Sequence, residues 1–283
     1  MREISGERFT GERALFGSSG LNINCSIFAD GESPLKESSD IYVENSSFQW
    51  KYPFWYCRNV EVKNCTFAEM ARAGIWYTEN ISLENCMYEA PKGFRRVRGM
   101  RLKNADFPNA GETMWSCRDA ELLDVSVKGD YFGMNCEGIS INNFKIAGNY
   151  CFDGCKNIEM HNAQMLSKDA FWNCENVTVY DSYIYGEYLG WNSKNVTFIN
   201  CTIESLQGMC YMENVVMKGC RLLNTTLSFE YSTVDAEITG GIDSVKNPSG
   251  GIIKAEKIGE LIMEKDKVDV NATRIVTGTD YGI

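Results

Sequence analysis

Several charged side chains of this sequence could do chemistry if they lay on one face. The acidic candidates are Asp130, Asp153 and Asp169, and the basic candidates are Lys92, Arg95 and Arg96. Carboxylates on neighbouring strands about 5 Å apart can divide general acid and general base work, or bind Ca²⁺. Lys and Arg bind anionic groups such as the carboxylate of an acidic sugar. The alternative is a solvated charged face without a ligand.

Three further residues would complete such a site. Phe152, Phe171 and Glu187 come from the same kind of segment as the aspartates. A line of exposed aromatic rings beside polar groups is a usual platform for a saccharide ligand. Aromatic ladders that pack only on one another are the alternative.

All these candidates lie within a sequence repeat of 19–21 residues. Its clearest part is a five-residue run with apolar first and third positions, such as VEVKN (60–64), ISINN (139–143) and VTVYD (177–181). Alternation with period two indicates a short strand with one buried face. The fifth residue is nearly always Asn or Asp, which tolerate left-handed turn conformations. Stacked from unit to unit, these residues can also form an amide ladder.

The remainder of each unit leaves no room for a helix of ten residues. A second turn residue precedes each strand, so a unit has at least two corners and about three short sides. This predicts a parallel β-solenoid of about eleven coils, stacked at steps of about 4.8 Å. A leucine-rich repeat is disfavoured, because the half of the unit outside the strand is rich in Trp, Tyr, Phe and Cys.

The regularity of the repeat predicts the domain organisation. We expect an N-terminal cap over 1–20, regular coils over 21–226 and irregular C-terminal coils or a cap over 227–268. Residues 269–283 are expected to be a frayed tail, as chain ends often are.

The segment before each strand carries columns of aromatic residues and cysteines, as in Phe54-Trp55-Tyr56-Cys57. Small or apolar residues replace Cys in this column, namely Thr78, Val97, Ser193 and Met212, which predicts that the column points inward. If the segment is a strand, Trp then points inward with Cys, whereas Phe and Tyr or Asn point outward. Arg95-Arg96 and Asp153 interrupt the aromatic columns, and a charge there needs a partner or solvent.

The charges of these segments change sign along the chain. The early units carry Lys51, Arg72 and Lys92, and the later ones carry Glu112, Asp130, Asp169 and Glu187. This predicts one face that is basic toward the N-terminus and acidic toward the C-terminus.

Composition excludes several classes of partner. A net charge of −10 argues against nucleic acids and anionic membrane surfaces. No stretch is apolar enough to span a membrane, and the first residues lack the apolar core of a signal peptide, so we expect a cytoplasmic protein. We expect the 12 cysteines to be free thiols. The sole histidine, His161, falls at an outward strand position, which argues against Ser-His-Asp or Cys-His catalysis.

The stretches GERALFG, QWKYPFWYC, EMARAGIWYT, SKDAFWNCENVTVYDS and EYLGWNS resemble a bacterial domain-of-unknown-function family. The resemblance covers nearly the whole chain. It implies an all-β fold, a single-stranded right-handed parallel β-helix of the pectin-lyase-like kind. That wider group includes polysaccharide lyases and hydrolases, and most of its members are secreted.

Three functions are therefore open. The first is binding of a saccharide-like or extended polar ligand on the aromatic and charged outer face. The second is a polysaccharide lyase or glycoside hydrolase that uses the clustered carboxylates. The third is a non-catalytic interaction scaffold. No cofactor is expected, with Ca²⁺ as an alternative, and a homo-oligomer is left open.

Overall fold

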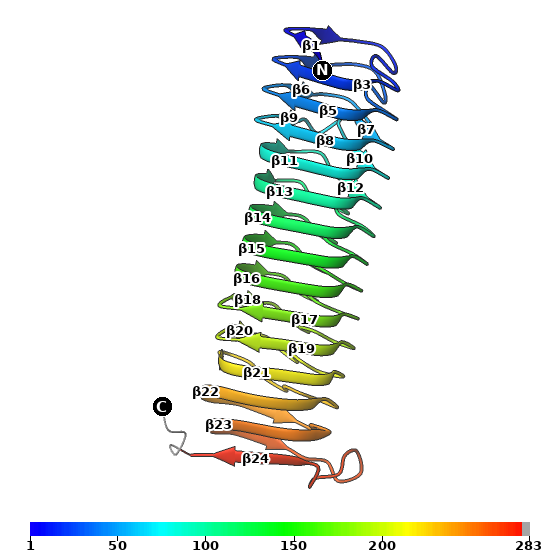
Figure 1. The fold of residues 1–283 in the computed structure, drawn as a ribbon. Helices are drawn as coiled ribbons and strands as arrows, with labels where there is room; N and C mark the ends of the chain where they lie inside the picture. The colour runs from blue at the N-terminus through cyan, green and yellow to red at the C-terminus, as the bar shows by residue number, and fades with distance from the viewer. Residues whose placement is uncertain (279–283) are drawn as a thin grey trace. The chain divides into compact units, whose positions relative to one another are not determined.

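The computed structural model describes residues 1–278, and they contain strands and turns but no α-helix. Each coil contributes one long strand, and neighbouring long strands pair in parallel (Figure 1). The structure thus confirms the predicted all-β parallel β-helix. It has about 15 coils rather than eleven, because coils also form outside residues 21–226.

The first structural unit comprises Met1–Ile146. Its long strands are β1 (Arg2–Ser5), β3 (Ser19–Asn24), β5 (Ser39–Glu44), β8 (Arg58–Lys63), β11 (Glu79–Tyr88), β13 (Arg98–Phe107), β14 (Arg118–Lys128) and β15 (Glu137–Ala147). Short strands of the same sheet are β2 (Arg8–Phe9), β4 (Ile27–Phe28), β6 (Ser47–Phe48) and β9 (Thr66–Phe67). A second, three-stranded sheet consists of β7 (Phe54–Trp55), β10 (Ile75–Trp76) and β12 (Phe94–Arg95).

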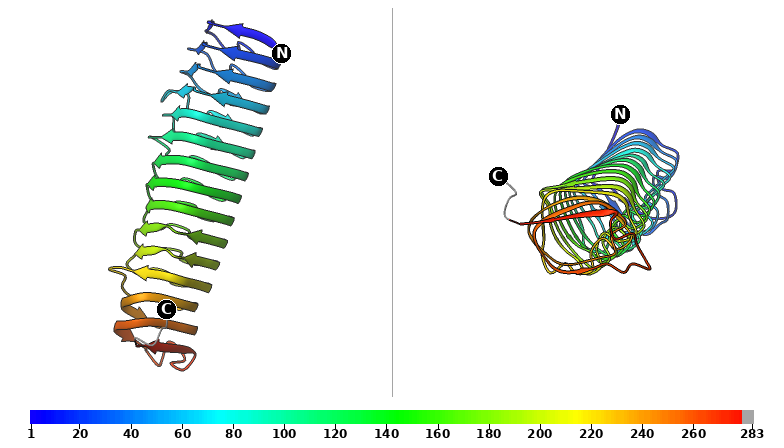
Figure 2. Two further views of the ribbon diagram at one scale, coloured as in Figure 1. Left: turned by 60° about the vertical axis from the view of Figure 1, so that its left-hand side comes forward. Right: turned by 90° about the horizontal axis from the view of Figure 1, so that it is seen from below.

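The second unit begins at Ala147. Its strands are β16 (Lys156–Leu166), β17 (Glu175–Tyr180), β18 (Tyr183–Tyr185), β19 (Lys194–Ile199), β20 (Thr202–Glu204), β21 (Glu213–Leu222), β22 (Thr233–Lys246), β23 (Gly250–Ile262) and β24 (Thr273–Thr277). Within each unit, successive coils overlie one another (Figure 2).

Both chain ends are more regular than the sequence indicates. Strand β1 lies in the segment expected to be a cap, and it pairs with β3 as another coil of the sheet. Strand β24 lies within the segment expected to be frayed, and it pairs in parallel with β23. Of that expected tail, residues 279–283 lie outside the described part of the chain.

The core follows the alternation of the strands. Val60 and Val62 of β8 lie beside Ile81 and Leu83 of β11, and all four are buried. Beyond the Asn turn, a second interior column stacks aromatic rings at centroid distances of 4.6–4.7 Å, through Phe28, Phe48, Phe67 and Tyr88. Each coil thus extends the same apolar columns by one residue.

The cysteines belong to this interior. All 12 are free thiols, and all except Cys25 are buried. Burial raises the pKa of Cys57 and Cys65 to about 12, so both stay protonated at neutral pH. These thiols act as compact apolar side chains, as the sequence indicates.

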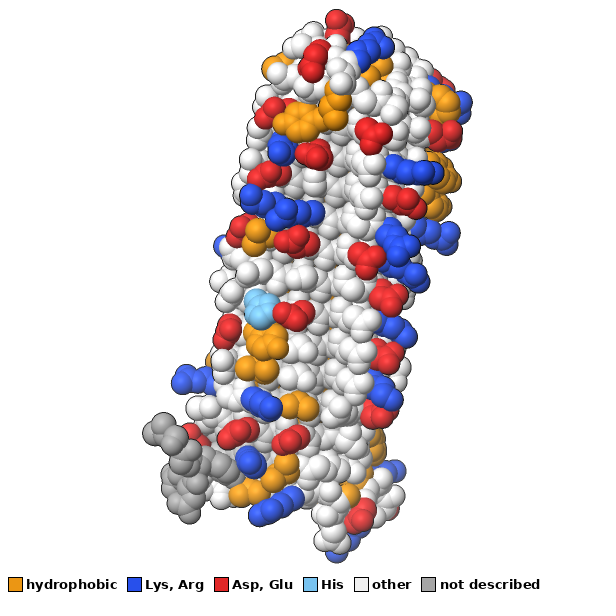
Figure 3. Space-filling view, in the orientation of Figure 1, with side chains coloured by type: hydrophobic (Ala, Val, Ile, Leu, Met, Phe, Trp, Pro, Cys, Tyr) orange, Lys and Arg blue, Asp and Glu red, His pale blue; other side chains and the backbone are white. Residues whose placement is uncertain are grey.

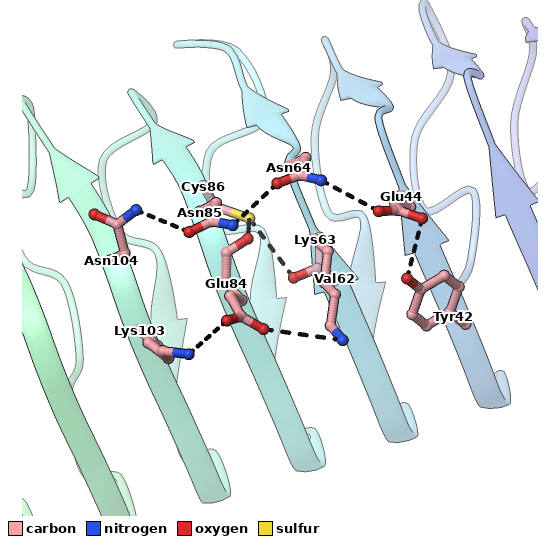
Figure 4. Close-up of polar contacts among 10 residues, drawn as sticks. All are labelled: Tyr42, Glu44, Val62, Lys63, Asn64, Glu84, Asn85, Cys86, Lys103 and Asn104. Atoms are coloured by element: carbon pink, nitrogen blue, oxygen red, sulfur yellow. Dashed lines mark hydrogen bonds and ion pairs between the residues drawn. The ribbon is translucent and has the colours of Figure 1, made fainter.

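The Asn turns form amide ladders that run in one direction. Asn64, Asn85 and Asn104 all have left-handed backbone conformations, with φ of 51°, 55° and 48°. Asn104 Nδ2 donates to Asn85 Oδ1 at 2.8 Å, and Asn85 Nδ2 donates to Asn64 Oδ1 at 3.1 Å (Figure 4). Asn64 Nδ2 then donates to the carboxylate of Glu44 at 3.2 Å. In this ladder the donor always lies on the later coil, and the carboxylate of Glu44 accepts the last hydrogen bond.

Candidate functional site

The side chains of the aromatic columns point in other directions than the sequence predicts. Phe54 and Phe94 are fully buried, whereas Trp55 and Trp76 are partly exposed. The reason is the residue that follows Trp, which is left-handed, with φ of 57° at Tyr56. This turn breaks the alternation, so that Trp points outward although the Cys two positions later points inward.

The same correction applies to two expected ligand-binding residues. Phe152 and Phe171 are buried with no exposed surface, and their rings stack at 5.8 Å. Both have positive φ, 61° and 56°, in place of the extended backbone that the alternation argument assumes. Their expected outward orientation is therefore wrong, and they are part of the core.

The outward-pointing tryptophans stack face to face on one another. Trp55 and Trp76 stack at 5.2 Å with an angle of 6° between their planes, and Trp172 and Trp191 stack at 5.8 Å. Trp55 Nε1 also donates to the carbonyl of Ala73 at 2.6 Å. A sugar ring packs on the face of an aromatic ring, and stacked rings present mainly their edges. The tryptophan column therefore stabilises successive coils and is a poor saccharide platform.

Arginine takes the place of an aromatic ring in one coil. The guanidinium of Arg95 lies 4.6 Å from the ring centroid of Trp76 and 4.8 Å from that of Trp115. The guanidinium of Arg96 lies 5.9 Å from the ring centroid of Tyr77. Arginine continues the stack because its planar group packs on aromatic faces. The aromatic rings are therefore the partners that the two arginine charges need within these columns.

The charged face is neutralised pair by pair. Lys51 contacts Glu32 at 2.9 Å, and Lys168 contacts Glu187 at 3.0 Å. Lys92 pairs with Glu112 at 3.1 Å. Figure 3 shows positive and negative side chains interleaved on the face that it presents. The expected change from basic to acidic along the chain is therefore weakened by local ion pairs, which contribute little individually at an exposed surface.

The three candidate acids have different surroundings. Asp130 is an exposed residue of the first unit. Asp153, in the second unit, accepts a hydrogen bond from Asn173 Nδ2 at 2.8 Å, and Asn192 Nδ2 donates to Asn173 Oδ1 at 2.8 Å. Asp153 is thus the carboxylate at the start of another amide ladder. Gly154 stands in this coil where the later coils have Asn173 and Asn192. Because glycine has no side chain to accept the hydrogen bond of Asn173, the preceding residue Asp153 accepts it.

Asp169 is the most unusual of the three. Its side chain is buried, with 2% of the residue exposed. Burial raises the pKa of this carboxyl, the charge of Lys168 and a hydrogen bond with Tyr150 lower it, and the charge of Glu187 raises it. The net result is a raised pKa, so ionised Asp169 destabilises the folded state.

We therefore expect Asp169→Asn to stabilise the protein at pH 7. The folded pKa lies above the unfolded value of 3.8, so wild-type stability rises as pH falls through the folded pKa and levels off below 3.8. The amide removes this cost while keeping similar hydrogen-bonding capacity. Urea unfolding at pH 7 and near pH 3.5 measures the difference. An equal loss of stability at both values would contradict the prediction.

A cleft of about 470 Å³ lies at a corner of the second unit. Its lining comes from five successive coils, chiefly from the three in which the chain leaves β16, β18 and β20. Its lining includes the Lys168–Glu187 ion pair together with Leu166, Tyr185, Glu204, Leu206 and Asn224. Of the residues that the sequence proposes for ligand binding, Glu187 lies in this cleft. We call it the Tyr185 cleft.

Tyr185 differs from the other exposed tyrosines of this unit. It is 50% exposed, and within residues 1–278 its ring joins no aromatic pair and its hydroxyl makes no hydrogen bond. In contrast, the hydroxyl of Tyr183 contacts Glu204 at 3.4 Å, and the ring of Tyr211 lies 5.0 Å from that of Trp191. The ring of Tyr185 is therefore available to a ligand.

Sequence reasoning missed this cleft although a signal exists. Leu166 and Tyr185 occupy matching positions of β16 and β18, directly after a buried residue. Small, polar or charged residues stand at the corresponding positions of earlier coils, namely Ala29, Gln49, Ala68, Glu89, Pro108, Lys128 and Ala147. Two large apolar side chains in succession at an outward position where earlier coils carry small, polar or charged residues would have pointed to the cleft.

The described residues hold no candidate metal centre, and the sole histidine lies at the surface. Within 1–278, no three His, Cys, Asp or Glu side chains are grouped so that they could hold a metal ion. His161 lies at the surface, where Nε2 is 2.9 Å from Glu159 Oε1 and the ring stacks on Tyr180 at 4.4 Å. This part of the chain also has no helix that is long and apolar enough to cross a membrane.

Comparison with known proteins gives a family and several solved folds. The family described as "Protein of unknown function (DUF3737)" matches residues 2–276. No curated protein matches the sequence. The surface adhesin PfbA of Streptococcus pneumoniae is 9% identical, with a TM-score of 0.47, over 90% of this chain and 82% of that one.

Two enzymes of polysaccharide metabolism are similar at the same level. The alginate lyase AlyF-OU02, solved with G6, is 9% identical, with a TM-score of 0.44, over 96% of this chain and 82% of that one. The A-module of mannuronan C-5 epimerase AlgE4 from Azotobacter vinelandii is 10% identical, with a TM-score of 0.34, over 98% and 89%. At these scores the likeness carries no argument about function.

Proposed function

The chain belongs to this DUF3737 family of unknown function, and we propose from its own surface that it binds an extended, saccharide-like ligand in the Tyr185 cleft. The observation that carries the proposal is the exposed, unstacked ring of Tyr185 beside polar side chains. Aromatic and apolar side chains with a few placed polar groups are the usual lining of a ligand site.

The polar groups of the cleft suit the hydroxyl groups of a sugar. Lys168 Nζ lies 3.0 Å from Glu187 Oε2, and Asn224 Nδ2 donates to Glu204 Oε1 at 2.8 Å. Each pair combines donors with carboxylate acceptors, and a hydroxyl group can bond to both. The pairs hold each other in place before any ligand arrives, which lowers the ordering cost of binding.

The geometry of the coils favours an extended ligand. Tyr185 pairs in register with Leu166 on one side and with Glu204 on the other. These residues are on successive coils at steps of about 4.8 Å. A ligand that follows the cleft therefore contacts three coils, and its ring can pack on Tyr185 while its ends reach the polar pairs.

Binding without catalysis fits the carboxylates better than the lyase or hydrolase alternative does. A glycosidase needs two carboxyl groups on opposite sides of the scissile bond. Glu187 and Glu204 line the cleft but already engage Lys168 and Asn224. Asp169 is buried, and Asp153 belongs to an amide ladder.

We expect Tyr185→Ala to weaken saccharide binding roughly tenfold, since it removes the ring on which the ligand packs. Thermal-shift screening against xylo-, cello- and malto-oligosaccharides and oligogalacturonates identifies a ligand, because a compound that binds the folded state raises the melting temperature. Isothermal titration calorimetry then gives Kd for wild type and variant.

Tyr211→Ala is the matched control, because Tyr211 is also exposed in the second unit but does not line the cleft. It should leave Kd unchanged. If no oligosaccharide raises the melting temperature, or if both variants lose affinity equally, the proposal fails. The interaction scaffold then becomes the better interpretation.

A further inference from the structure

We infer that Lys92, Arg95 and Arg96 form a binding site for an oxyanion, a sulfate or carboxylate group, on the first unit. The site does not depend on the Tyr185 cleft, which belongs to the second unit. Three observations support it: an excess of positive charge, two guanidinium groups that lie over aromatic rings, and a carboxylate shared between two cations.

The excess of charge comes from the sharing of Glu112. Its Oε2 lies 3.1 Å from Lys92 Nζ and 3.9 Å from a terminal nitrogen of Arg95. Arg96 makes no ion pair within residues 1–278 and is exposed. The set therefore has three positive charges and one negative. The nearby Arg98 does not alter this excess, because it contacts Asp119 at 3.4 Å.

The aromatic rings hold the two guanidinium groups in place. Arg95 is sandwiched at 4.6 and 4.8 Å between Trp76 and Trp115, and Arg96 lies over Tyr77. Arg95 and Arg96 are consecutive in the chain, and the rings of Trp76 and Tyr77 on which they lie are 6.3 Å apart. Because the faces of Arg95 are covered, its N–H donors point along the edge of the group.

This arrangement is suited to a planar or tetrahedral oxyanion. A guanidinium presents parallel N–H donors that match two oxygens of a carboxylate or sulfate. Immobilising the side chain beforehand lowers the entropy cost of forming those bonds. The side chain of Arg95 is 26% exposed and that of Glu112 is 39% exposed, so a ligand can reach the set and displace the carboxylate.

The decisive experiment measures anion binding by four variants. Isothermal titration calorimetry at low ionic strength uses inorganic sulfate, an oligogalacturonate and, as a neutral control, maltotetraose. Arg96→Gln should weaken anion binding about tenfold, as expected for loss of a charge-assisted contact. Arg101→Gln removes the same charge from an exposed residue that pairs with Glu121, and it should change Kd less than about twofold.

The carboxylate variants are expected to act in the opposite direction. Glu112→Gln frees Lys92 and Arg95 and should tighten anion binding several-fold. Glu121→Gln removes the same negative charge, but from beside Arg101, and it should have little effect on the Kd for the anion. Sulfate binding alone would support a site for small anions, and preference for the oligogalacturonate would support an acidic saccharide.

Three results would overturn the inference. The first is that neither anion binds at millimolar concentration. The second is that Arg96→Gln and Arg101→Gln weaken binding equally, because binding then follows net charge alone. The third is that Glu112→Gln leaves Kd unchanged. The melting temperature of each variant verifies that it is folded.

Discussion

Replacing Phe67 by Ala should lower the free energy of unfolding by about 3–5 kcal/mol, the usual cost of deleting a buried phenyl ring. Phe67 has no exposed surface, and its ring stacks between Phe48 at 4.7 Å and Tyr88 at 4.6 Å. The cavity cannot easily collapse, because hydrogen bonds between adjacent coils fix the coil spacing. Urea denaturation followed by tryptophan fluorescence measures the loss.

Tyr56→Ala is the control for an aromatic ring of similar size in the same unit. Tyr56 is 49% exposed and stacks on Tyr77 at 4.8 Å. Its removal should cost less than about 1.5 kcal/mol, the value of one aromatic pair. A loss for Phe67→Ala as small as that for Tyr56→Ala would mean that the interior aromatic column does not hold the coils together.

The second large effect is expected for Gly186→Ala. A Cβ at this position would lie 2.0 Å from the backbone oxygen of Ser167 and 2.4 Å from its carbonyl carbon. The backbone cannot retreat without loss of the hydrogen bond from Gly186 N to the carbonyl of Glu204, which is 3.0 Å long. We expect a loss of more than about 3 kcal/mol in the free energy of unfolding.

Gly240→Ala separates this clash from simple backbone strain. Gly240 has φ of 89°, and a Cβ there would meet no atom within 4 Å. Left-handed strain alone should cost about 1–2 kcal/mol. Equal losses for the two variants would show that the contact with Ser167 is relieved at little cost. Because Gly186 also lines the Tyr185 cleft, a folded Gly186→Ala variant should bind ligand more weakly.

The sequence predicts the repeating turns well, because their chemistry is local. Asn64 and Asn85 each come at the end of an alternating run, and both adopt the left-handed conformation that Asn tolerates better than most residues. The interior positions of the strands follow from the same alternation, as Val60 and Val62 illustrate. Period and turn chemistry are sufficient for the fold class.

The aromatic segment could not be predicted in the same way. The alternation rule assumes an extended backbone, but Phe152, Phe171 and Tyr56 all have positive φ. Nothing about these residue types signals a left-handed conformation, since bulky aromatic residues rarely adopt it. In the structure, backbone hydrogen bonds to neighbouring coils hold it, such as that from Tyr56 N to the carbonyl of Trp76 at 3.0 Å.

The candidate site was harder to predict than the aromatic segment, because it depends on which side chains already have a partner within the protein. From sequence, Asp153 and Phe171 look like parts of a site, yet Asp153 bonds to Asn173 and Phe171 is buried. Tyr185 looks ordinary, and its significance is that its ring has no such partner. Only the structure distinguishes an available side chain from an occupied one.

The uniform direction of the amide ladders has a consequence for how the protein is made. Asn104 donates to Asn85, and Asn85 donates to Asn64, so each donor of this ladder finds its acceptor on the coil that precedes it in the chain. During synthesis the N-terminal part emerges from the ribosome first. Each new coil can therefore satisfy its amide as soon as it emerges, on a template that is already ordered. If the coils formed in order from the C-terminal end, each amide donor would have no acceptor until the preceding coil had formed.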